Sequence, residues 1–132
     1  MPATKQEIDD LTRELETLAQ TIHDDSISLA ETIAALDESH EEIETMKATH
    51  LSTVLNDRFE INNKLKYTND DQRKVAVQEL LSSDANYNAM KSAQTRLVAA
   101  QATTRAAIEK NRNLHKSKLL VLQYYASLSQ EI

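Results

Sequence analysis

Hydrophobic residues recur every three or four positions from the start of the chain. The clearest stretch, with successive spacings of 3, 4, 3 and 4, consists of Ile8, Leu11, Leu15, Leu18 and Ile22. Acidic residues, threonine and glutamine fill most positions between them. This spacing is the heptad pattern of a coiled-coil helix, in which one apolar stripe faces a partner helix. We therefore predict a long helix that begins near Thr4, which has the spacing of a capping box with Glu7.

The apolar stripe continues as far as Ile61 and Leu65, with an interruption at Asp25. The apolar positions that follow Asp25 have moved out of the first register, which we interpret as a stutter in the heptad repeat. The simplest interpretation is one helix over about residues 4–65. The alternative is that the polar stretch at 23–26 breaks this helix, with Ser28 and Glu31 as the capping box of a new helix.

Two helix-start signals follow in the next part of the chain. Asn69 with Gln72 resembles a cap pair, and Ser82, Ser83 and Asp84 offer the next caps. We predict a short helix over about 70–81 and a long helix over about 84–130. A short helix between two long ones lets the chain reverse direction without glycine. The predicted fold is therefore all-α: a long antiparallel helical hairpin of coiled-coil type, with a short helix at its tip.

Composition supports a single helical domain over residues 1–132. The chain has no glycine, one proline and no cysteine, which leaves little material for β-hairpins and none for disulfides or thiolate sites. It has no apolar run long enough for a membrane span and no apolar signal core at its start. We expect a cytoplasmic protein that does not bind membranes.

Charge is distributed unevenly between the two halves of the chain. The net charge is −6, with 15 acidic and four basic residues in positions 1–60 and six acidic and 11 basic residues in positions 61–132. If the hairpin turns near residue 75, the acidic run 31–44 faces the basic residues between 110 and 118, and the alanine-rich segment 97–108 faces residues 43–54. We predict that the bases of the last helix form ion pairs with the first helix.

The same turn position would leave the first apolar positions of the chain beyond the end of the last helix. An apolar stripe without an intrachain partner requires another chain, so we expect a dimer or a higher oligomer. The predicted oligomer interface comprises Ile8, Leu11, Leu15, Leu18 and Ile22, with the C-terminal residues Leu120, Tyr124 and Leu128.

Catalytic and metal-binding patterns are weak in this sequence. No serine, histidine and aspartate have the spacing of a known triad, and a glycine-rich phosphate loop is excluded. Asp37, His40 and Glu44 lie on one side of the first predicted helix, but di-iron bundles require a Glu-x-x-His motif on each of two helices. We interpret His40 as a polar residue at the helix contact, and we expect no enzyme activity, no cofactor and no metal.

Basic residues on the last predicted helix support an alternative function in nucleic-acid metabolism. The candidate contacts to a phosphate backbone are Arg96, Arg105, Lys110 and Arg112. A further alternative is that the acidic first helix mimics nucleic acid. We favour ion pairing between the two long helices over both.

Residues 67–91 resemble a pattern of small helical-hairpin proteins of phages and prophages, whose genes lie near recombination and single-strand-annealing genes. The matching residues are Thr68, Asn69, Asp70, Arg73, Lys74, Leu80, Leu81, Asp84 and Tyr87. Such proteins have no assigned activity, so the resemblance implies an accessory or adaptor role in phage or mobile-element biology. We predict a non-enzymatic, oligomeric coiled-coil protein that acts by binding a protein partner, which the sequence does not identify.

Overall fold

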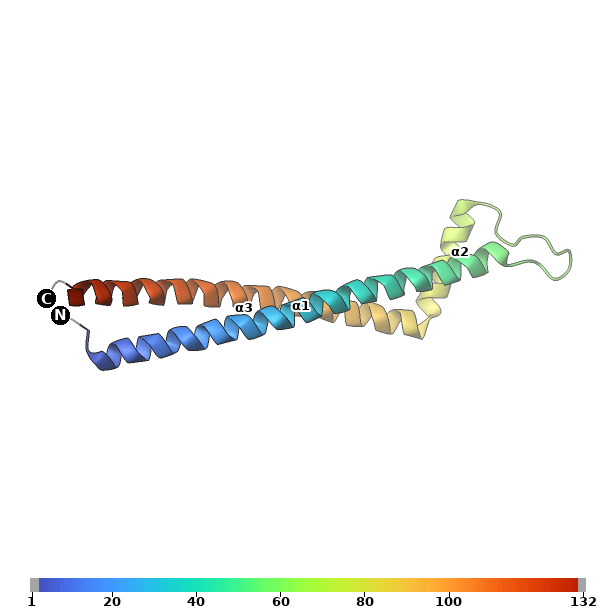
Figure 1. Ribbon diagram of the computed structural model, residues 1–132. Coiled ribbons are helices and arrows are strands. Elements are labelled where there is room, and N and C mark those ends of the chain that lie inside the picture. Colours follow the sequence, from blue (N-terminus) through green and yellow to red (C-terminus); the bar gives the residue numbers. More distant parts are fainter. Residues whose placement is uncertain (1–2, 131–132) are drawn as a thin grey trace. The chain divides into compact units, whose positions relative to one another are not determined.

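Three helices make up the chain in the computed structural model, which describes residues 3–130. They are α1 (Lys5–Asn56), α2 (Asp70–Ser83) and α3 (Ala85–Gln130) (Figure 1). The part of the chain that the structure describes is all-α, with one isolated β-bridge between Arg58 and Leu65 and no strand. No helix within it combines the length and the apolar character that crossing a bilayer requires.

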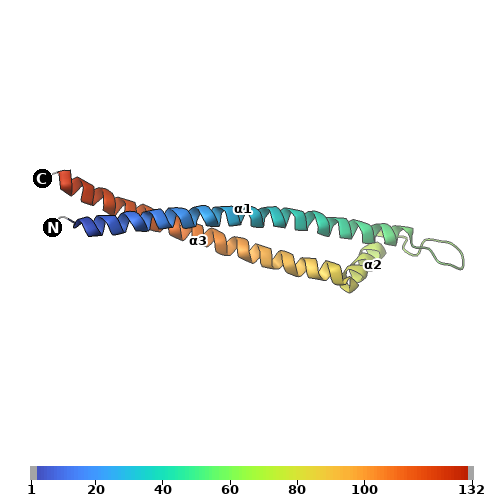
Figure 2. The same cartoon turned by 60° about the horizontal axis from the view of Figure 1, so that its bottom comes forward.

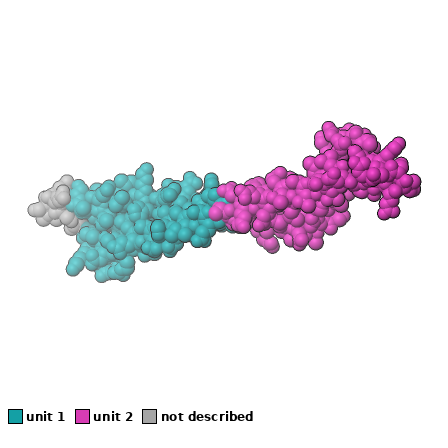
Figure 3. Space-filling view, turned by 45° about the vertical axis from the view of Figure 1, so that its right-hand side comes forward, with its two compact units in different colours: residues 1–33, 100–132 teal, residues 34–99 magenta. Residues whose placement is uncertain are grey.

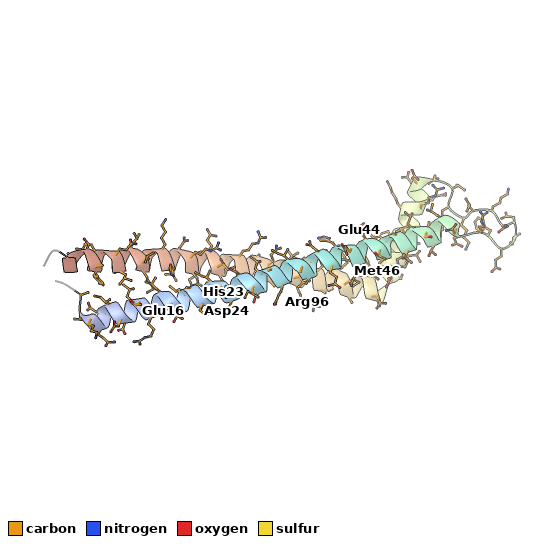
Figure 4. All side chains as sticks on the ribbon, viewed as in Figure 1. Glu16, His23, Asp24, Glu44, Met46 and Arg96 are labelled. Atoms are coloured by element: carbon orange, nitrogen blue, oxygen red, sulfur yellow. The ribbon has the colours of Figure 1, made fainter. Side chains whose placement is uncertain are left out.

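Helix α1 begins with a reciprocal capping box and continues without a break. The Thr4 backbone N–H donates to Glu7 Oε2 and the Glu7 N–H donates to Thr4 Oγ1, both at 3.1 Å. At 23–26, the Ser26 hydroxyl donates to the carbonyl oxygen of Ile22 at 2.7 Å, so it bonds inside the helix and caps no new one. The alternative of a helix break at 23–26 is therefore wrong, and Figure 4 labels His23 and Asp24 on the continuous α1.

Helix α1 ends at Asn56, earlier than the predicted end near residue 65. The following loop pairs with itself: the Phe59 N–H donates to the Lys64 carbonyl at 2.9 Å, and the Lys66 N–H donates to the Asp57 carbonyl at 3.0 Å. These bonds satisfy backbone groups that would otherwise continue the helix. Ile61, predicted to lie on the apolar stripe, is 99% exposed in this loop.

Helix α2 starts at a cap that the sequence signals. The Asn69 side chain accepts a hydrogen bond from the Gln72 N–H at 2.8 Å, and Gln72 Oε1 accepts one from the Thr68 N–H at 3.1 Å. Helix α2 buries Ala76 and Leu81. The observed bounds of α2 and α3 lie within two residues of the predicted ones, and a single residue separates the two helices.

The chain divides into two compact units, coloured in Figure 3. Unit 1 contains residues up to 33 and residues from 100 onward, and unit 2 contains residues 34–99. Helices α1 and α3 each contribute to both units, whereas α2 lies in unit 2. In unit 1, the first part of α1 and the last part of α3 lie side by side in both ribbon views (Figures 1 and 2).

Less exposed positions of α1 keep one heptad spacing along most of the helix. In unit 1 these positions, all buried or half-buried, are Ile8, Leu11, Leu15, Leu18, Ile22, Asp25 and Leu29. In unit 2 the same spacing continues through Leu36, Ser39, Ile43, Met46 and His50. The predicted stutter after Ile22 is therefore wrong, because the polar Asp25 occupies the stripe position and stays partly hydrated.

Helix α3 has a matching stripe with a different composition. Its half-buried and buried positions are spaced by three and four residues from Tyr87 to Tyr125. Half of these positions are polar: Gln94, Gln101, Thr104, Asn111, His115 and Lys118. Among the described residues, Ile108 is the one large apolar side chain of α3 that is buried, with 5% of its surface exposed. The helix contacts therefore combine a mainly apolar stripe of α1 with a stripe of α3 that is half polar.

Contacts inside each unit correct the predicted pairing of positions. In unit 2, His40 contacts Gln94 and His50 contacts Asp84, whereas in unit 1 Glu14 contacts Lys118. The position numbers of these pairs add to 132 or 134, and half of each sum places the turn near residue 66 or 67, so the predicted turn near residue 75 is wrong. The reason is that α1 ends at Asn56 instead of near residue 65, so the chain turns earlier and each residue of α3 lies beside a different residue of α1 than predicted.

Candidate protein-interaction surfaces

The predicted N-terminal interface lies within the intrachain contact of unit 1. Leu15 is buried, and Ile8, Leu11, Leu18 and Ile22 are half-buried. Next to Leu15, Glu14 Oε2 lies 2.7 Å from Lys118 Nζ of α3. The prediction that this end of α1 overhangs without a partner is therefore wrong, since α3 extends far enough to contact it.

Two of the three predicted C-terminal interface residues lie on the exposed side of α3. Leu120 is 59% exposed and Tyr124 is 61% exposed, whereas Leu128 is half-buried. Leu114 and Val121 are also exposed. The resulting surface, which we term the outer stripe, comprises Leu114, Leu120, Val121 and Tyr124. The sequence indicates an exposed apolar surface here, because residues 119–125 contain more apolar side chains than one buried helix face can hold.

The basic residues of α3 stay mostly unpaired. Arg96, Arg105, Lys110 and Arg112 are all exposed (Arg96 is labelled in Figure 4). Among residues 3–130, Lys118 is the one base of α3 that forms an ion pair with an acidic side chain. The predicted neutralisation of these bases by α1 is therefore wrong except at Lys118, because the register differs from the predicted one.

Two of these arginines line a groove with α1 in unit 1. Arg105 and Arg112, spaced by seven residues, border a cavity of about 570 Å³ with Ser26, Leu29 and Ile108, together with Glu109 and Asn113. Arg105, within the alanine-rich segment of α3, therefore lies near Ser26 and Leu29 of α1. The prediction that this segment faces residues 43–54 is wrong.

The junction of α2 and α3 is organised by one carboxylate. Asp84 Oδ1 accepts hydrogen bonds from the backbone N–H groups of Asn86 at 3.0 Å and Tyr87 at 3.1 Å, which caps α3. Asp84 Oδ2 lies 2.7 Å from His50 Nε2 of α1. The hydrogen bond from His50, followed by that from the Tyr87 N–H, lowers the pKa of the Asp84 carboxyl below its ordinary value of 3.8. These contacts join the start of α3 to α1.

The metal candidate is not assembled as a site. Within residues 3–130, no three acidic or histidine side chains are arranged to hold a metal ion. His40 instead contacts Gln94 of α3, with 3.1 Å between His40 Nδ1 and Gln94 Nε2. His40 thus contributes a polar contact between α1 and α3 inside unit 2.

A groove between α1 and α2 in unit 2 was not predicted. The α1–α2 groove has a volume of about 730 Å³ and is lined by Glu44, Lys47, Ala48, Leu51, Leu55, Asp70, Arg73, Lys74, Val77, Gln78 and Leu81. Figure 4 labels Glu44 on α1. Leu51 and Leu55 lie off the heptad stripe with helical i, i+4 spacing, and this spacing is the sequence signal from which an exposed apolar face could have been predicted.

No protein-family model, no curated protein and no solved structure matches this chain. The resemblance of residues 67–91 to helical-hairpin proteins of phages therefore stays a prediction. Function is inferred below from the contacts, charges and exposed surfaces of the described residues.

Proposed function

We propose that this chain is an antiparallel helical hairpin of coiled-coil type that self-associates and acts by protein–protein interaction, without catalysing a reaction. Contacts inside each unit support the hairpin. As position numbers rise along α1 from His40 to His50, the numbers of their partners fall from Gln94 to Asp84. The role implied by the phage-like pattern is that of a cytoplasmic accessory or adaptor protein.

The observation that carries self-association is the exposure of the outer stripe. Its four large apolar side chains lie within 11 residues of α3 and face solvent rather than α1. Fully burying an exposed side chain of this kind contributes about 1.5–3 kcal/mol, and each of these side chains, 40–61% exposed, would contribute roughly half of that. In a two-fold symmetric dimer both copies bury the same stripe, so eight side chains offset an association entropy of about 4–15 kcal/mol.

Sedimentation equilibrium of the full chain tests this proposal. We expect a dimer or higher oligomer for the unsubstituted chain at about 100 µM, where even a weak contact is populated. The double variant Leu120→Asp/Tyr124→Asp should be monomeric with unchanged helicity in circular dichroism. Ile27→Asp is the matched control, because Ile27 is an exposed apolar residue of α1 in the same unit. A full chain that is monomeric at this concentration would contradict self-association.

A second candidate function, nucleic-acid binding, is favoured by one observation. Arg105 and Arg112 border the same groove and have no carboxylate partner in the part of the chain that the structure describes. Arginine pairs of this kind bind phosphates. If the chain binds nucleic acid, single- or double-stranded DNA should bind at about 0.15 M salt with a steep salt dependence. Substituting both arginines by glutamine should then weaken binding.

A further inference from the structure

The α1–α2 groove has an apolar lining that solvent reaches. Leu51 and Leu55 of α1 are both exposed, and Val77 of α2 is half-buried. The α1 lining extends from residue 44 to 55 and the α2 lining from residue 70 to 81. Each segment is about 16 Å long at 1.5 Å per residue, which matches three turns of a third helix laid into the groove.

The groove has more basic than acidic side chains, and one of its bases has no carboxylate partner in the described part of the chain. Lys47 forms an ion pair with Glu44 at 3.4 Å, and the Arg73 Nη1 atom donates to Asp70 Oδ1 at 3.3 Å. Lys74 has no ion pair within residues 3–130. Three bases and two acids line the groove, which gives it a net charge of +1.

Arg73 has an unsatisfied donor. Its Nε atom is buried and has no hydrogen-bond acceptor, the one side-chain polar atom in this state among the described residues. A guanidinium carries five N–H donors, and a buried donor without an acceptor is unfavourable. A carboxylate in the groove would balance the positive charges of the Arg73 guanidinium and of Lys74.

We propose that the α1–α2 groove binds an amphipathic helix of another protein that carries a carboxylate beside its apolar face. The apolar lining takes the apolar face of the helix, as in other grooves formed between helices. Arg73 and Lys74 select acidic over basic helices, because a basic side chain would leave three cations together. The outer stripe lies in unit 1, so this site is separate from the surface proposed for self-association.

The test is a selection from a displayed library of helical peptides of about 14 residues, a length of four turns, against the full-length chain. Peptides that also bind the Leu51→Asp variant are removed. We expect the selected peptides to share apolar residues at helical spacing and glutamate or aspartate beside them. Enrichment of no peptides, or of peptides with lysine and arginine in those positions, would overturn the proposal.

Variants of the chain then test whether the selected acidic peptide binds in the α1–α2 groove. Its affinity should fall about tenfold or more with Lys74→Glu, as expected for a central interface residue. Val75→Asp is the control, because Val75 is an exposed apolar residue of α2 that does not line the groove. Equal loss with Val75→Asp, or unchanged affinity with Lys74→Glu, would contradict this site.

Sedimentation of the same variants separates the groove from self-association. Leu51→Asp should leave the oligomeric state unchanged, and the Leu120→Asp/Tyr124→Asp variant should bind the peptide normally. If Leu51→Asp instead dissociates the oligomer, a second copy of the chain occupies the groove and the proposal of a foreign helix is wrong. Peptide binding by a monomeric chain would support the groove while contradicting the proposed self-association.

Discussion

His50 Nε2 lies 2.7 Å from Asp84 Oδ2, although 34 residues separate them in the sequence. The same carboxylate caps α3 through its other oxygen, and the Asp84 backbone N–H donates to the Leu81 carbonyl at the end of α2. One residue therefore determines where α2 ends, where α3 begins and how that junction contacts α1. Since unit 2 contains all of these groups, we expect its stability to depend on Asp84.

The first prediction concerns pH. Because the pKa of Asp84 is lowered in the folded protein, its ionised form contributes stability that is fully present above its unfolded pKa, about 3.9. This contribution is lost as pH falls through the lower, folded pKa. Asp84→Asn keeps a capping oxygen but cannot ionise. Urea unfolding between about pH 5 and pH 2.5 should therefore show a steeper loss of stability in the unsubstituted chain than in Asp84→Asn.

Glu14→Gln is the control for this pH dependence, since Glu14 pairs with Lys118 in unit 1 and caps no helix. It should retain the steep acid limb of the unsubstituted chain. Identical pH profiles for Asp84→Asn and the unsubstituted chain would contradict the role of the ionised carboxylate.

The second prediction distinguishes two neighbouring leucines of α2. Leu81 is 4% exposed and Leu80 is 36% exposed, so Leu81 anchors the short helix. Leu81→Ala should lower the free energy of unfolding by about 2–5 kcal/mol, the range for a truncated core leucine. Leu80→Ala should lower it by less than about 1 kcal/mol, because little buried surface is removed. Guanidinium unfolding measures both. Equal losses would show that Leu80 packs as deeply as Leu81.

The third prediction concerns the loop between α1 and α2. Asn63 has a φ angle of +54°, in the left-handed region, and the Arg58 side chain donates to its carbonyl at 2.9 Å. Asparagine tolerates this region, whereas a β-branched residue is disfavoured there. Asn63→Val should lower the free energy of unfolding by about 1–2 kcal/mol. Asn63→Gly should be nearly neutral, and thermal unfolding compares the two. A neutral valine variant would contradict the left-handed conformation.

The fourth prediction concerns the polar stripe of α3. Asn111 is half-buried at a heptad position, and its side chain makes no hydrogen bond within residues 3–130. Asn111→Leu should raise the free energy of unfolding by about 1 kcal/mol, because it adds apolar contact with α1. Asn113→Leu, at an exposed position of the same helix, is the control and should have little effect. Urea unfolding measures both variants. A lower free energy of unfolding for Asn111→Leu would contradict the prediction and would show that the asparagine side chain stabilises unit 1.

Local sequence signals determined the type of structure and most helix starts. The capping box at Thr4, the Asn69 cap and the acidic cap at Asp84 are short-range interactions between residues three positions apart. The apolar spacing from Ile8 to Ile22 likewise depends on one helix alone. The sequence therefore predicted an all-α chain with a short helix between two long ones, because neighbours in the chain carry these signals.

Tertiary contacts alone decided which residues face each other. The end of α1 at Asn56 depends on backbone bonds across the following loop, such as that between Lys66 and Asp57, and heptad spacing alone does not exclude a longer helix. That loop sets the register of α3 against α1, and the observed register gives Glu14 a partner where none was predicted and pairs His50 with Asp84 instead of the alanine-rich segment. The exposed outer stripe and the α1–α2 groove follow from this register, since a side chain is free to bind a partner only where the chain's own helices leave it uncovered.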